Sequence, residues 1–153
     1  MKKPSSRSSI GVFDSGLGGL TVFKVLARRM PEESLIYFGD TAHVPYGSKS
    51  PEAIARYSSE VAKFLAKRGI KLLVVACNTS SAWALPAIRK AVKVPVIGVI
   101  EPGARGAIVA SRGGRIGIIG TEATVKSGAY DRAIKTLRKG ARTASAACPL
   151  FVP

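Results

Sequence analysis

The sequence predicts an α/β fold with a mainly parallel sheet and flanking helices. Short apolar runs recur along the chain, and a stretch with helical periodicity follows each of them. This alternation is typical of βαβ units. The run at 72–76 is apolar throughout, which is typical of a strand buried on both faces of a parallel sheet.

The expected elements can be followed along the chain. Strands are expected at 10–13, 35–38, 72–76, 96–100 and 115–119, with a weaker sixth run at 144–150. Helices are expected at 20–30, 51–68, 81–92, 102–112 and 124–139.

Local chemistry places the helix boundaries. Ser50 can cap the helix that begins at Pro51, because proline suits the first helical position and serine satisfies free N–H groups. Gly69 is expected to end that helix. Pro86 is expected to kink the helix over 81–92, because it lacks a backbone donor.

Composition limits the class of protein. The chain has 153 residues, 46% of them hydrophobic, which suffices for a core of one domain's size. No apolar run approaches the roughly 20 residues that span a bilayer, so no membrane partner is expected. The start of the chain predicts a disordered basic tail over 1–9 rather than a signal peptide. Two cysteines, Cys77 and Cys148, predict reduced thiols in the cytoplasm.

The charge is strongly basic. Lys and Arg total 24 against 9 Asp and Glu, a formal net charge of +15. Such a charge can indicate a nucleic-acid partner. The basic residues are scattered in short pairs near expected helix ends, however, where cations favour the helix dipole. A solvated basic surface is therefore the preferred interpretation, and a non-catalytic module that binds nucleic acid is the alternative.

Polar side chains follow each of the first five expected strands. The groups are Asp14-Ser15, Asp40-Thr41, Cys77-Asn78-Thr79, Glu101 and Thr121-Glu122. Ligands of parallel α/β sheets bind beyond the carboxyl ends of the strands. We therefore expect these groups to meet at one rim and to form a binding or active site.

The turn after the first strand is similar to a dinucleotide-binding turn. Gly16 and Gly18 have the required spacing, but Thr21 occupies the third glycine position, and Asp14 would repel a pyrophosphate. The segment 47–50 lacks the residue order of a phosphate-binding lysine loop. Nucleotide binding is therefore disfavoured.

Cys77 is the strongest candidate for chemistry. It ends an apolar strand and precedes 78–81, a run of good helix caps, so backbone N–H groups would favour its thiolate. Such a thiolate can act as a nucleophile or as a base, and Asn78, Thr79 and Ser80 can hydrogen-bond a small carboxylate. A papain-like pairing would need His43; spacing does not exclude it, but the flanking residues favour a loop or rim role for this histidine.

Several motifs together resemble the glutamate racemases of the aspartate/glutamate racemase superfamily. They lie at 13–20, 37–41, 44–47, 76–79, 99–103, 120–124 and 147–153. The resemblance runs in order from residue 10 to residue 153.

The resemblance implies inversion of glutamate at its α-carbon without a cofactor or a metal ion, supplying D-glutamate for peptidoglycan. Two cysteines would work on opposite faces of the substrate, since one base that returned the proton to the face it came from would not invert the centre. Catalytic roles are implied for Cys77 and for Asp14, which would assist proton transfer or meet the ammonium group. Substrate contacts are implied for Asp14, Ser15, Tyr46, Gly47, Asn78, Thr79, Thr121 and Thr124. An aspartate racemase is the closer alternative, and a homo-oligomer is expected only of a full-length enzyme.

One feature of the family is missing. Its second cysteine has a Cys-Thr-His context that does not occur in these 153 residues. Cys148 matches an ordinary strand of the family and is interpreted as structural. We therefore expect an amino-terminal portion, inactive alone, with a first α/β domain at 10–100 that lacks its C-terminal completion and the start of a second α/β domain at 101–153.

Overall fold

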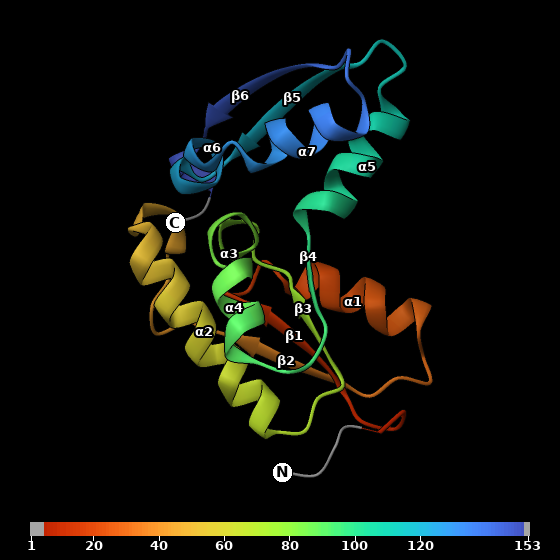
Figure 1. Cartoon of the computed structure of the whole chain (residues 1–153), viewed down its shortest axis with the longest axis vertical. Coiled ribbons are helices and arrows are strands. Elements are labelled where there is room, and N and C mark those ends of the chain that lie inside the picture. The colour runs from red at the N-terminus through yellow and green to blue at the C-terminus, as the bar shows by residue number, and fades with distance from the viewer. Residues whose placement is uncertain (1–4, 152–153) are drawn as a thin grey trace.

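The computed structural model describes residues 5–151 and confirms the α/β class, with two parallel sheets (Figure 1). The larger sheet has the order β2-β1-β3-β4. Its strands are β1 (Ile10–Asp14), β2 (Leu35–Gly39), β3 (Leu72–Val75) and β4 (Val96–Gly98). The smaller sheet pairs β5 (Arg115–Gly120) with β6 (Arg142–Ala147).

Helices connect the strands. The α-helices are α1 (Leu20–Arg29), α2 (Pro51–Lys67), α3 (Asn78–Trp83), α4 (Leu85–Ala91), α5 (Ile100–Ala110), α6 (Glu122–Ser127) and α7 (Ala129–Leu137). Two short 3-10 turns are η1 (Tyr46–Ser48) and η2 (Pro149–Phe151). The bounds of the first five strands and of the helices expected at 20–30, 51–68 and 102–112 agree with the sequence to within two residues.

Two of the expected helices are each divided into two. The helix expected at 81–92 begins earlier, at Asn78, and breaks after Trp83. Pro86 lies in the first turn of α4, where its missing N–H costs nothing, so it helps to start a helix rather than kinking one. Gly128, with a left-handed φ of 61°, divides the helix expected at 124–139 into α6 and α7.

Helices cover both faces of the larger sheet (Figure 1). On one face α1 packs against Val12 and Val74 of the central strands. On the other face α2, α3 and α4 pack against residues that include Phe13 and Val75. Consecutive side chains of a strand point to opposite faces, which explains why every residue of β1 is buried.

The smaller sheet is covered on one face by α5 and α7. Its core contains Ala104 of α5, Ile118 of β5 and Ile134 of α7. The helix α5 follows β4 and carries the chain from the larger sheet to the smaller one (Figure 1). The expected boundary between 100 and 101 falls at the start of this helix and stays a prediction.

The predicted tail over 1–9 is described only in part. Residues 1–4 lie outside the described residues. In 5–9 the N–H of Ser8 donates to the carbonyl of Ser5 at 3.0 Å, and the N–H of Lys71 donates to the carbonyl of Ser9 at 2.8 Å. Within residues 5–151, no helix is long and apolar enough to cross a membrane.

Replacing Leu65 by alanine should destabilise the fold. Leu65 is fully buried in α2 within the main core. Deleting a buried leucine side chain leaves a cavity and costs about 2–5 kcal/mol. Urea unfolding should show this loss, whereas Val109→Ala, at a side chain that is 85% exposed, should change the free energy of unfolding by less than about 0.5 kcal/mol. Equal effects of the two substitutions would contradict the packing described above.

Candidate active site

The carboxyl ends of β1, β3 and β5 open into one cavity of about 880 Å³, a size that suits a small ligand. Phe13 of β1 lies in register with Val75 of β3, so Asp14 and Cys77 reach the same rim. The strand β5 belongs to the other sheet and brings Thr121 to the cavity. Of the predicted site residues, the cavity is lined by Asp14, Ser15, Cys77, Asn78, Thr79, Thr121 and Thr124.

Cys77 is buried and is the N-cap residue of α3. Its sulfur accepts the N–H of Ser80 at 3.4 Å, and its thiol donates to the hydroxyl oxygen of Ser15 at 3.3 Å. A hydrogen-bond donor directed at sulfur stabilises negative charge on that atom. Because a hydroxyl group can both donate and accept, Ser15 can contact Cys77 in its thiol or its thiolate form.

Asp14 is the last residue of β1 and is buried. Its Oδ2 accepts the N–H of Gly16 at 3.0 Å, and the hydroxyl of Tyr37 donates to the Gly16 carbonyl at 2.8 Å. Burial, and then the charge of Asp14, raise the pKa of Tyr37 to about 12, so its phenol stays a donor at neutral pH. These bonds hold a carboxylate at the cavity wall, where it can accept an ammonium group.

Three threonine hydroxyls connect the two sheets at the cavity. Thr79 Oγ1 of α3 lies 3.0 Å from Thr121 Oγ1 and 3.2 Å from Thr124 Oγ1. Thr121 also caps α6, because its hydroxyl accepts the N–H of Thr124 at 3.2 Å. Next to them, Trp83 Nε1 donates to the carbonyl of Ala123 at 2.7 Å. These contacts attach α3, which begins directly after Cys77, to the cavity wall that the smaller sheet and α6 form.

Tyr46 and Gly47 lie behind the cavity wall and are not among the described residues that line it. A Cβ added to Gly47 would lie only 2.5 Å from Thr121 Cβ, so the absence of a side chain allows η1 to pack against Thr121. Tyr46 is only 1% exposed. Contact of these two residues with a substrate stays a prediction.

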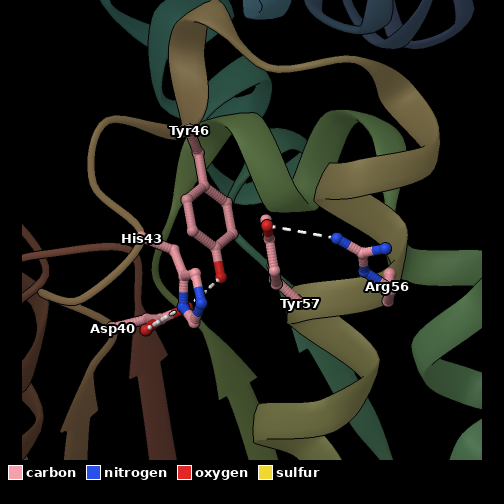
Figure 2. A network of polar contacts seen from close by, with 5 residues as sticks. All are labelled: Asp40, His43, Tyr46, Arg56 and Tyr57. Carbon is pink, nitrogen blue, oxygen red and sulfur yellow. Dashed lines mark hydrogen bonds and ion pairs between the residues drawn. The ribbon is translucent and has the colours of Figure 1, made fainter.

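A polar network secures Tyr46 (Figure 2). The buried carboxylate of Asp40 accepts the Tyr46 hydroxyl at 2.6 Å and contacts His43 Nδ1 at 2.8 Å. The His43 ring stacks on Tyr57 with centroids 4.1 Å apart, and Arg56 Nη2 donates to the Tyr57 hydroxyl at 3.1 Å. His43 is thus bound to Asp40. It is not among the described residues that line the cavity with Cys77, in agreement with the loop role expected for it.

Tyr46 is held as a neutral donor. Burial raises its pKa far above the usual value, and the hydrogen bond and charge of Asp40 raise it further. A tyrosinate would therefore be strongly disfavoured beside this carboxylate.

The expectation that all five polar groups meet at one rim is wrong for Asp40, Glu101 and Glu122, which are not among the described residues that line the cavity, although Thr41 and Thr121 are. Glu101 is 67% exposed and pairs with Arg105 at 2.7 Å, one turn along α5. Glu122 pairs with Lys126 at 2.7 Å, one turn along α6. Both carboxylates lie in the first turn of a helix, a position that favours negative charge. The rim is also built from two sheets rather than one.

Tyr130 is a cavity residue that the sequence did not indicate. Its hydroxyl donates to Asn78 Oδ1 at 2.7 Å, and its side chain lines the cavity. In the sequence it is one apolar position of an amphipathic helix, with no local signal of a site. Within the described part of the chain, Cys148 does not line the cavity, and no cluster of His, Cys, Asp or Glu could hold a metal ion.

Comparisons with known proteins agree with one another. Residues 11–149 match the profile of a family described as Asp/Glu/Hydantoin racemase. A glutamate racemase from Geobacter metallireducens is 59% identical over 145 residues, which are 95% of this chain and 54% of that protein. A glutamate racemase isoform from Bacillus anthracis has a similar structure, with a TM-score of 0.92 and 45% identity over 96% of this chain and 55% of that one.

A third similar protein has been solved with a ligand bound to it. The glutamate racemase from Francisella tularensis, solved in complex with D-glutamate, matches with a TM-score of 0.87 and 40% identity over 95% of this chain and 54% of that one. The chain therefore spans about half the length of the relatives that it matches.

Replacing Tyr46 by phenylalanine should lower stability in a pH-dependent way. At pH 7 the buried Asp40 loses a donor, which should cost about 2 kcal/mol. The wild type loses stability as pH rises above about 10, by up to about 1.4 kcal/mol per pH unit from this residue, because only the unfolded tyrosine ionises readily. The deficit of the variant, measured by urea unfolding from pH 7 to 11, should therefore shrink above pH 10. In Leu65→Ala the deficit should stay constant over this range; a constant deficit in Tyr46→Phe would contradict the proton linkage.

Proposed function

Because this chain belongs to the Asp/Glu/Hydantoin racemase family, we propose that it forms one side of the active site of a glutamate racemase that needs no cofactor. The observation that carries the proposal is the convergence of the Cys77 thiol and the Asp14 carboxylate on one cavity. Glutamate is preferred over aspartate because the similar proteins named above are glutamate racemases.

In the proposed reaction, Cys77 is the base on one face of the substrate. Its thiolate takes the α-proton, so that a Cα–H bond breaks, an S–H bond forms, and the electron pair remains on the α-carbon and its carboxylate. The N–H of Ser80 and the hydroxyl of Ser15 stabilise the thiolate before the transfer. The charge that develops on the substrate carboxylate requires preorganised donors, which Asn78, Thr79 and Thr121 supply from the cavity wall.

Asp14 has a separate role in this proposal. Its carboxylate accepts the substrate ammonium group and keeps it protonated, and a protonated amine makes the neighbouring α-proton more acidic. Asp14 also assists proton transfer to and from Cys77. Tyr46 and Gly47 complete the substrate site from the segment behind Thr121.

Inversion also requires a donor on the opposite face. A second thiol gives a proton to the α-carbon there, in the Cys-Thr-His context that is absent from these 153 residues. Cys148 is not proposed for that role, since it follows β6 and, among the described residues, is not one that lines the cavity.

The proposal extends to the biological setting. The full-length enzyme would act in the cytoplasm and supply D-glutamate for peptidoglycan, and it could assemble from identical subunits. This chain would correspond to a first domain at 10–100 and the start of a second at 101–153, following the family resemblance.

The chain alone should exchange the α-proton of glutamate without inverting it. When it is incubated separately with L- and D-glutamate in deuterated water, one enantiomer should lose its α-proton signal in NMR spectra. Chiral chromatography should detect no formation of the other enantiomer. Cys77→Ala should slow the exchange by about a hundredfold or more, the usual contribution of a general base.

Cys148→Ala is the matched control and should exchange at the wild-type rate. Accumulation of the opposite enantiomer would show that a second base lies within this chain. Exchange that persists unchanged in Cys77→Ala would exclude Cys77 as the base.

A further inference from the structure

We propose that Tyr130 is a positioning residue, which orients the carboxamide of Asn78 so that its N–H groups, rather than its oxygen, serve a substrate carboxylate. The inference rests on the proposed function and extends it to a residue of α7, one of the two helices that cover the smaller sheet.

The contact between the two side chains sets the orientation of the amide. The Tyr130 hydroxyl lies 2.7 Å from Asn78 Oδ1, the usual length of an O–H···O bond. An asparagine side chain has one acceptor oxygen and one NH₂ group with two donors. With the oxygen bound to Tyr130, the donors remain available at the cavity that both residues line.

The position of Tyr130 is itself well defined. Its ring packs with the core between α5, α7 and the smaller sheet. A Cβ added to Gly103 of α5 would lie 2.9 Å from the Tyr130 hydroxyl oxygen and 3.1 Å from its ring, so this glycine leaves room for the tyrosine. Burial raises the pKa of Tyr130 above its usual value, which keeps the hydroxyl protonated at neutral pH.

The orientation matters because the two ends of an amide recognise opposite partners. An N–H group donates to a carboxylate, whereas an amide oxygen directed at the same carboxylate would repel it. Asp14 on the cavity wall attracts the ammonium group instead, because its carboxylate carries the opposite charge. A fixed Asn78 and a fixed Asp14 therefore define which end of an amino acid lies where.

The partners come from different parts of the fold. Asn78 begins α3 above the larger sheet, and Tyr130 belongs to α7 on the smaller sheet. The amide is therefore oriented only while the two sheets are held together, which couples substrate recognition to their relative position.

The test is binding of glutamate to the 153-residue chain and its variants, measured by calorimetry. Tyr130→Phe keeps the ring and removes the hydroxyl, and should weaken binding about threefold to tenfold, the effect of one neutral hydrogen bond. Gly103→Ala, which displaces the same hydroxyl, should weaken binding similarly. Tyr57→Phe removes a hydroxyl whose partner is Arg56, outside the cavity, and should bind as the wild type does.

A double substitution separates positioning from a general structural effect. If Tyr130 acts through Asn78, then Asn78→Ala with Tyr130→Phe should bind no more weakly than Asn78→Ala alone. The side-chain amide signal of Asn78 in ¹⁵N NMR spectra should shift in Tyr130→Phe while the other amide signals keep their dispersion.

The outcomes are distinct. Wild-type affinity in both Tyr130→Phe and Gly103→Ala, or additive losses in the double variant, would overturn the role of Tyr130 and leave the proposed function intact. Failure of the wild-type chain to bind glutamate would overturn the proposed function together with the role of Tyr130, whereas binding that neither variant weakens would overturn the role of Tyr130 alone.

Discussion

The hydroxyl of Thr79 joins the two sheets at the point where their strands end, and the cavity depends on this contact. Thr79 is the last of three consecutive residues, 77–79, and each of the three side chains contacts a different part of the fold. Cys77 contacts Ser15 after β1, Asn78 accepts from Tyr130 of α7, and Thr79 bonds to Thr121 and Thr124 of the second sheet's rim. The turn from β3 to α3 therefore connects each wall of the cavity to the others. A shift of this turn would separate the thiol from its neighbours and open the interface between the sheets.

Buried polar groups behind the wall reinforce this arrangement. Within residues 5–151 every buried side-chain nitrogen or oxygen atom has a hydrogen-bond partner. Asp40 is one of these groups, and an unpaired buried carboxylate is costly. Tyr46 and His43 satisfy it, which fixes the segment whose Gly47 packs against Thr121. Asp40, His43 and Tyr46 are not among the described residues that line the cavity, and they support the chemistry at Cys77 by fixing the segment that packs against Thr121.

The sequence predicted more of the larger sheet than of the second one. Apolar runs and turn residues placed each strand of the larger sheet, because buried parallel strands need continuous apolar segments. The same reasoning predicted that Asp14 and Cys77 would lie at one rim, since the carboxyl ends of parallel strands share an edge of the sheet. It was wrong for Glu101 and Glu122, which form ion pairs along their own helices, and for Asp40, which is bound to Tyr46 and His43. It also missed that Ala84 and Gly128 divide two helices, since a break of one residue hardly disturbs the periodicity.

The sequence by itself determined the α/β class, the order of the elements along the chain and the motifs that mark the family, because apolar periodicity, turn chemistry and short motifs are local. The tertiary structure alone decided that two sheets rather than one build the cavity, that Glu101 and Glu122 lie outside it, and that Tyr130 reaches Asn78. Those contacts join residues up to 52 positions apart in the chain, and side-chain packing selects them in three dimensions. No local pattern around Tyr130 encodes a partner at the start of α3, beside the larger sheet.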